Sequence, residues 1–223
     1  MSFWRKVIAI TWKDVLAEMR TKEIISAVLV FTLLVVVIFN FAFGTSQDVV
    51  KQVASGMLWV TFAFAGVLSL NRSFIIEKED GCLEGLMVSP VSREVIYVGK
   101  MLGSLLFMLV IEAITLPVFA FLFNLDVISM QQIVIIFVTT VGFVSVGTLF
   151  SALAVNTKAR EMVLPILFFP IVAPVIIFAV TASQLALDGE PWSGLYSWLM
   201  PIVAFDAIFL VVSFLVFAFV IEE

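Results

Sequence analysis

The sequence lacks the residues that most catalytic and cofactor sites require. It contains no histidine, so a histidine general base, metal ligand or haem ligand is excluded. The one cysteine, Cys82, cannot form an internal disulfide or a thiolate cluster. No Gly-x-x-x-x-Gly-Lys-Ser/Thr motif occurs, so a phosphate-binding loop for ATP is absent. We therefore expect that the chain is not an enzyme and binds no metal.

Charge is also scarce, and this decides the class of protein. Only 13% of the 223 residues are charged, 63% are hydrophobic, and the mean hydropathy is +1.21. A soluble domain of this length could not bury so much apolar surface. A membrane-spanning helix needs about 20 apolar residues. Six stretches are long enough: 24–43, 56–76, 101–123, 133–155, 162–187 and 201–221. We predict an all-α membrane protein with a single transmembrane domain, residues 1–223.

The basic residues predict the orientation of the chain. With six spans, eleven of the twelve Lys and Arg residues fall on the side that holds both termini and the second and fourth connections. The positive-inside rule then places both termini in the cytoplasm, in an inner membrane. No signal peptide is evident, because residues 1–23 carry five basic residues and lack a continuous apolar core. Nothing in the sequence resembles a nucleic-acid-binding surface.

Residues 1–23 have the pattern of an amphipathic helix. Apolar side chains recur at helical spacing, and the charged side chains fall mainly elsewhere: the apolar set is Trp4, Ile8, Trp12, Val15, Leu16 and Met19. Tryptophan and aliphatic residues opposite basic residues are typical of a helix that lies in the membrane interface. We predict an elbow helix that bends into the first span.

Residues 77–94 form the main charged segment of the chain, between spans two and three. Pro90 follows Ser89 and interrupts the segment. Ser92 could cap a second helix that runs into span three. The prediction is a short helix, a turn and a further helix, on the cytoplasmic side of the membrane.

Two acidic residues fall within predicted spans. Glu112 lies eleven residues past the start of its span, and no Lys or Arg lies deep in a span to pair with it. It is either a substrate, proton or subunit contact, or a neutral hydrogen-bonded structural residue. Asp206 lies about five residues into the last span, about 8 Å deep, from where it could reach the outer surface.

Span five carries Pro165, Pro170 and Pro174, which predict a kinked or broken helix. Residues 188–198, with interfacial aromatics, predict a short re-entrant or surface helix.

The charged segment resembles the motif of the ABC-2 type of ABC-transporter permease. That motif has an acidic/basic pair, Asp-Gly-Thr-Leu, a small-Pro turn and Gly-Lys before span three. Here these elements are residues 77–93 followed by Gly99-Lys100, and Cys82 stands where Thr is commoner. The resemblance implies that the segment, residues 77–100, docks on a separate ATPase. The residues it assigns to this coupling are Glu77, Lys78, Glu79, Asp80, Gly81, Leu83, Leu86, Pro90 and Arg93.

Within that superfamily, the proline-rich stretch 160–177 is similar to span five of the cytochrome c maturation protein B family of haem exporters. This resemblance implies a membrane subunit that works with a cytoplasmic ABC ATPase and a second copy of itself. It also implies a haem-handling membrane protein and a periplasmic haem chaperone as partners. Haem would then be the cargo of the complex, and ATP would be bound by the partner.

Three alternatives remain open at this point. The chain could be an ABC-2 permease for a lipid or drug, although few polar residues other than Glu112 line the spans. It could be an assembly scaffold with no transport path. It could also be a secondary transporter that uses Glu112 to carry protons, which would work without an ATPase.

Overall fold

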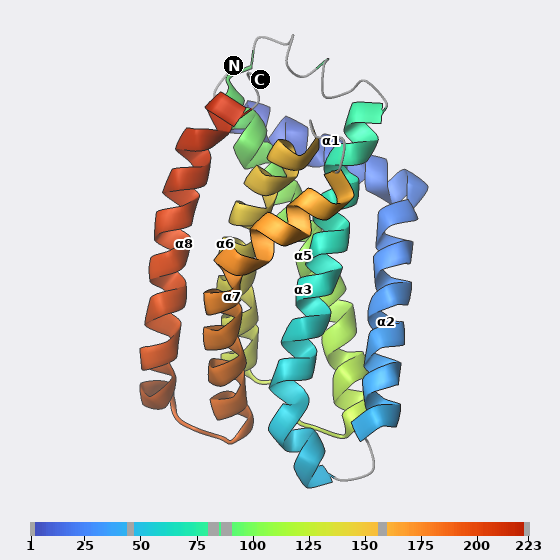
Figure 1. Ribbon diagram of the computed structural model, residues 1–223, viewed down its shortest axis with the longest axis vertical. Coiled ribbons are helices and arrows are strands. Elements are labelled where there is room, and N and C mark those ends of the chain that lie inside the picture. The colour runs from blue at the N-terminus through green and yellow to red at the C-terminus, as the bar shows by residue number, and fades with distance from the viewer. Residues whose placement is uncertain (1–2, 44–46, 80–84, 86–90, 156–159, 221–223) are drawn as a thin grey trace.

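The computed structural model is a bundle of long helices with one helix across its end (Figure 1). It describes residues 3–43, 47–79, 85, 91–155 and 160–220, and gives only the backbone for residues 71–79, 155 and 160–164. Within these ranges there are seven α-helices and no strand. They are α1 (Phe3–Thr21), α2 (Glu23–Phe43), α3 (Gln47–Glu79), α5 (Arg93–Phe123), α6 (Met130–Val155), α7 (Arg160–Leu187) and α8 (Trp192–Val220). Six of them, α2 to α8, are long and apolar enough to cross a membrane. The predicted fold class is confirmed.

The predicted elbow helix is α1. It lies across the end of the bundle where α8 ends and α5 begins (Figure 1). Lys22 connects it to α2 in the left-handed conformation, with φ of 53°. The Glu18 carboxylate accepts a hydrogen bond of 2.7 Å from the Ile25 backbone N–H. This contact satisfies a free donor at the start of α2 and places a negative charge at a helix N-terminus.

The apolar residues predicted for α1 mostly face outward. Trp4, Ile8 and Trp12 are all more than 60% exposed, whereas Val7 and Ile10 pack against the bundle. Apolar surface at the end of a membrane bundle suits the interface between lipid and water, where tryptophan is enriched.

Helices α3 and α8 both begin nine residues before the predicted spans, at Gln47 and Trp192. The prediction of a separate short helix in residues 188–198 was therefore wrong, because residues 192–198 are the first turns of α8. Pro201, which the sequence placed at the start of a span, lies inside α8. A helix at the membrane surface can continue into polar and aromatic residues, so hydropathy marks the apolar part of it and not its end.

Helix α6 is the centre of the bundle and packs against α3, α5, α7 and α8. The buried core has two large clusters along the helices and a small third one around Ile111. One large cluster contains Val95, Met101 and Leu149 and reaches α1 through Ile10. The other large cluster contains Val50, Phe119 and Ile135, toward the opposite end. Five helices (α3, α5, α6, α7 and α8) contribute to both large clusters, so the division is a level across the bundle.

Two glycines of α3 test how closely this core is packed. A Cβ at Gly66 would contact the Phe143 ring of α6, whereas a Cβ at Gly56 would meet nothing within 4 Å. Gly66→Ala is expected to destabilise the protein by about 1–3 kcal/mol, because Phe143 is buried and also packs against Phe168. The measurement is the thermal unfolding midpoint in detergent. Gly56→Ala is the matched control and should be neutral or slightly stabilising; equal midpoints for both variants would contradict the packing.

Candidate functional site

The predicted docking segment, residues 77–100, joins the adjacent ends of α3 and α5. Glu77, Lys78 and Glu79 belong to the last turns of α3, where the structure gives the backbone alone. Arg93 is the first residue of α5. The other predicted residues lie outside the described part of the chain: Asp80, Gly81, Leu83, Leu86 and Pro90. Their role in docking stays a prediction, and the site is built below from the described residues that hold the segment.

The first turns of α5 are anchored deeply in the bundle. Ser92 occupies the N-cap position as predicted, but its side chain makes no capping hydrogen bond. Tyr97 is 1% exposed, and its hydroxyl lies 2.8 Å from Ser145 Oγ of α6. The Tyr97 ring also packs against Phe214 and Phe217 of α8. The start of α5 is therefore joined to α6 and α8.

Two glycines of α5 form a shallow groove for α1. A Cβ at Gly99 would lie 2.8 Å from Ile10 Cβ, and a Cβ at Gly103 would lie 3.4 Å from Asp14 Oδ2. The Thr11 hydroxyl donates a hydrogen bond of 3.0 Å to the Gly99 carbonyl. Small residues four positions apart let two helices approach closely, and here they bring α1 against the first half of α5.

A buried ion pair completes this contact. Lys100 Nζ lies 3.1 Å from Asp14 Oδ2, with side chains that are 1% and 16% exposed. Lys13 Nζ lies 3.2 Å from the other oxygen, Oδ1. A buried lysine is costly unless it is paired, so the position of α1 and the position of Lys100 depend on each other. We call this set (Thr11, Asp14, Gly99, Lys100 and Gly103) the elbow clamp.

The sequence indicated half of the elbow clamp. Lys100 was assigned to the docking segment, and Gly99 and Gly103 have the four-residue spacing that lets two helices approach closely. Asp14 gave no signal, because an acidic residue on an amphipathic helix is usually solvated. A charged residue between two glycines, at the start of an apolar span, was the feature that could have indicated a buried partner.

Glu112 of α5 is buried near the middle of the bundle, at 3% exposure. Its Oε1 accepts a hydrogen bond of 2.7 Å from the Thr140 hydroxyl of α6. Its Oε2 has no hydrogen-bond partner. The Thr140 contact gives Glu112 a structural partner on α6, and it leaves one carboxyl oxygen available for another ligand.

Asp206 of α8 is buried inside the bundle. Because α8 begins at Trp192, Asp206 is fourteen residues, about 21 Å, along the helix. It is 7% exposed, and its Oδ1 occupies the space that a Cβ on Gly142 of α6 would fill. The expectation that Asp206 reaches the outer surface was wrong. The physical reason is the contact between α6 and α8, because Gly142 has no side chain and leaves room for the Asp206 carboxyl inside the bundle.

At the opposite end of the bundle from α1, polar side chains join α3 to α7. Trp59 Nε1 donates to Ser183 Oγ at 2.8 Å, and Ser55 Oγ donates to Gln184 Oε1 at 2.9 Å. Gln132 of α6 donates to the same Ser183 hydroxyl at 3.0 Å. These contacts, with the pair described next, form a polar ladder along one face of α3.

The polar ladder ends in an exposed ion pair. Lys51 Nζ lies 3.1 Å from Asp188 Oδ1, and the two side chains are 50% and 45% exposed. The hydrogen bond from Lys51 lowers the pKa of Asp188. Water screens such a pair, so it stabilises the fold less than the buried hydrogen bonds of the polar ladder do. Among the described side chains, no group of three or more Asp, Glu or Cys residues could hold a metal ion.

The three prolines lie in one bent helix. Figure 1 shows α7 changing direction along its length while it remains helical. Pro170 and Pro174 are exposed on the outer face, and Phe168 and Val172 are buried on the inner face. A proline cannot donate the hydrogen bond of its turn, so α7 is locally weakened on the face away from the core. The predicted kink is confirmed.

The chain is similar to known proteins over most of its length. The family model described as "CcmB protein" matches residues 5–222. The chain is similar to "Heme exporter protein B" of Pseudomonas aeruginosa, with 29% identity over 79% of each chain. The protein of the same name from Rhodobacter capsulatus is 30% identical over 72% of this chain and 74% of its own. That of Escherichia coli K12 is 28% identical over 87% of each chain.

The elbow clamp predicts a large stability effect for a single charge. Asp14→Asn is expected to lower the free energy of unfolding by about 3 kcal/mol, because it removes the negative charge beside buried Lys100. The double variant Asp14→Leu, Lys100→Met should recover much of that loss, because it removes the buried charge as well. Unfolding in detergent, analysed as a double-mutant cycle, measures both.

Lys51→Met is the matched control for this experiment. It breaks an ion pair of equal length at the exposed end of the polar ladder. Its expected cost is below about 1 kcal/mol. Equal losses for Asp14→Asn and Lys51→Met would contradict a buried clamp.

Proposed function

The chain belongs to the CcmB protein family, and we propose that it is the membrane subunit of an ATP-driven complex for cytochrome c maturation. The names of the related proteins support haem export as the process it serves. In this proposal the subunit couples ATP hydrolysis by a partner either to haem export or to release of a haem-loaded periplasmic chaperone. The complex contains a cytoplasmic ABC ATPase, a second copy of this chain and a haem-handling membrane protein.

The elbow clamp is the observation that carries the coupling role. Lys100 is the last residue of the predicted docking segment, and it is paired with Asp14 of α1. A force on the segment would therefore move α1 and the start of α5 together, because separating them would break the ion pair between Asp14 and the buried Lys100. In this proposal α1 transmits that movement along the membrane interface.

A second connection leads from the docking segment to the far side of the membrane. The segment also continues from α3, which crosses the bundle and is joined to α7 by the polar ladder. Movement of α3 would thus reach the end of α7 near Asp188. The proline-weakened part of α7 provides a place where this helix could bend further. Coupling of two distant sites through such a two-state element is the proposed mechanism.

The proposed orientation places α1 and the docking segment in the cytoplasm. The clustered basic residues support it through the positive-inside rule. An ATPase in the cytoplasm would meet the end of the bundle that carries α1, and a periplasmic chaperone would meet the end that carries the polar ladder.

Docking is tested by reversing charge in the segment. Glu77→Lys, Glu79→Lys and Arg93→Glu together are expected to abolish co-purification of the ATPase subunit, because a charged interface loses complementarity when its signs are exchanged. Lys51→Glu is the control, since it also reverses charge but lies at the other end of the bundle. Undiminished ATPase recovery with the triple variant would refute docking at this segment.

The process is tested by complementation. Expression of this chain, with its own ATPase partner, in a bacterium that lacks its CcmB family protein should restore covalent haem attachment to cytochrome c. Haem-staining of separated proteins measures the result. Lack of restoration, with the chain present in the membrane and bound to its ATPase, would favour a lipid or drug cargo. Restoration by a variant that cannot bind the ATPase would favour a scaffold.

A further inference from the structure

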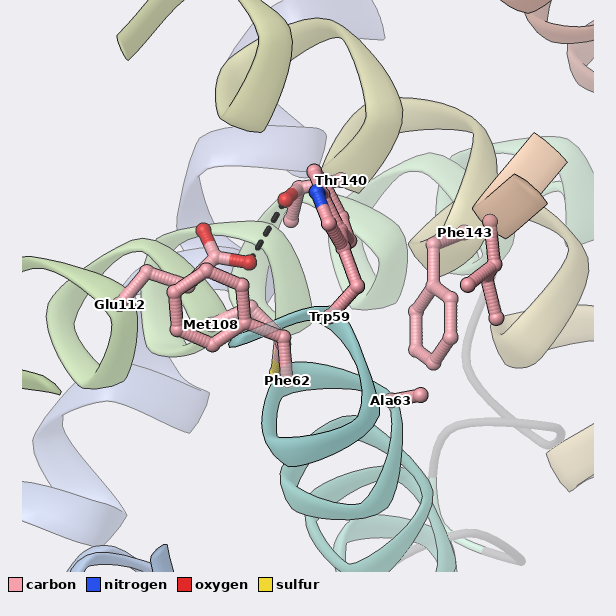
Figure 2. A pocket seen from close by; sticks show the side chains of 8 residues that line it. Trp59, Phe62, Ala63, Met108, Glu112, Thr140 and Phe143 are labelled. Atoms are coloured by element: carbon pink, nitrogen blue, oxygen red, sulfur yellow. Dashed lines mark hydrogen bonds between the residues drawn. The ribbon is translucent and has the colours of Figure 1, made fainter. Parts of the chain in front are cut away.

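A small cavity lies beside Glu112, between α3, α5, α6 and α7. Figure 2 shows the Glu112 carboxyl and the Thr140 hydroxyl facing each other at this cavity. The remaining lining residues carry no charge: Trp59, Phe62, Ala63, Met108, Phe143 and Ile176. The volume open to a water-sized molecule is about 10 Å³, close to the ~10–15 Å³ that one water requires.

The carboxyl group of Glu112 is incompletely satisfied by the protein. Oε1 accepts the Thr140 hydrogen bond, and Oε2 has no partner. A buried carboxylate needs a cation or several donors, and burial without them costs many kcal/mol. The cavity lining supplies no cation. Asp206, the other carboxyl buried in a spanning helix at this depth, lies against Gly142 of α6 and does not line the cavity.

A proton and one water molecule would satisfy both carboxyl oxygens of Glu112. A neutral carboxylic acid removes the buried charge and turns Oε2 into a donor. A water in the cavity could accept that hydrogen bond and donate one to the Thr140 oxygen. A buried water needs at least two polar partners, and the cavity provides these two.

We propose that Glu112 and Thr140 form a proton-binding site in the middle of the membrane, in which neutral Glu112 donates its hydrogen to one water molecule in the cavity. The site lies at the level where the two core clusters meet, since Phe62 belongs to one and Ala63 to the other. Ile176 contributes one wall from α7, two residues after Pro174. A change in the bend of α7 would thus alter the access of water to Glu112. The site does not depend on which cargo the complex handles.

Infrared spectroscopy of the purified protein at neutral pH tests the proton. The wild type should show the carbonyl-stretch band of a neutral carboxylic acid, and the band should shift in D₂O. Glu112→Gln should lose this band, and Thr140→Val should move it to higher frequency because a hydrogen bond to the carbonyl oxygen is lost. Asp206→Asn is the matched control, because it removes a buried carboxyl on another helix and must leave the Glu112 band in place. A wild-type spectrum identical to that of Glu112→Gln in this region would overturn the proton site.

The water is tested separately by filling the cavity. Ala63→Val adds two methyl groups to the lining and should displace the water, which shifts the Glu112 band and slows its exchange in D₂O. Gly56→Ala, on the same helix but away from the cavity, should leave the band unchanged. A Glu112 band that is identical in Ala63→Val and the wild type would overturn the bound water. Unchanged unfolding midpoints in the variants establish that they are folded.

Discussion

Helices in lipid cannot be held together by the hydrophobic effect, because the lipid chains are as apolar as the side chains. Close packing and buried polar contacts must therefore hold the bundle together, and this constraint explains where its special residues lie. Glycines occur where two helices approach most closely, as at Gly66 against Phe143 and Gly99 against Ile10. Polar side chains that are buried join one helix to another, as Tyr97 joins α5 to α6.

The polar contacts are concentrated at three levels of the bundle. The elbow clamp joins α1 to α5 at one end, the Glu112–Thr140 contact joins α5 to α6 in the middle, and the polar ladder joins α3 to α7 at the other end. Apart from the Tyr97–Ser145 contact, the described residues between these levels make mainly apolar contacts, which form the core clusters. A buried ion pair cannot separate cheaply, because a buried charge is costly when it loses a partner. Two helices that are joined at one of these levels are therefore expected to move together.

Sequence reasoning was most accurate where one physical quantity decides the outcome. Hydropathy located six helices, helical periodicity located α1, and three prolines located the bend in α7. It was wrong at the start of α8, because polar and aromatic residues near Trp192 interrupt the apolar signal without interrupting the helix. The burial of Asp206 was missed for another reason, since it depends on how Gly142 of α6 packs against α8. Five of the nine residues assigned to docking lie outside the described part of the chain, so their role rests on the resemblance alone.

The amino-acid sequence by itself determined the class of protein, the number of spans and the asymmetric distribution of basic residues, because each depends on composition along the chain. Only the tertiary structure decided the partners of the charged residues. Asp14 and Lys100 are distant in sequence, and nothing local distinguishes Asp14 from a solvated residue. The environment of Glu112 likewise depends on α6, which places Thr140 beside it. A buried charge is tolerated only with its partner, and partners are set by how helices pack.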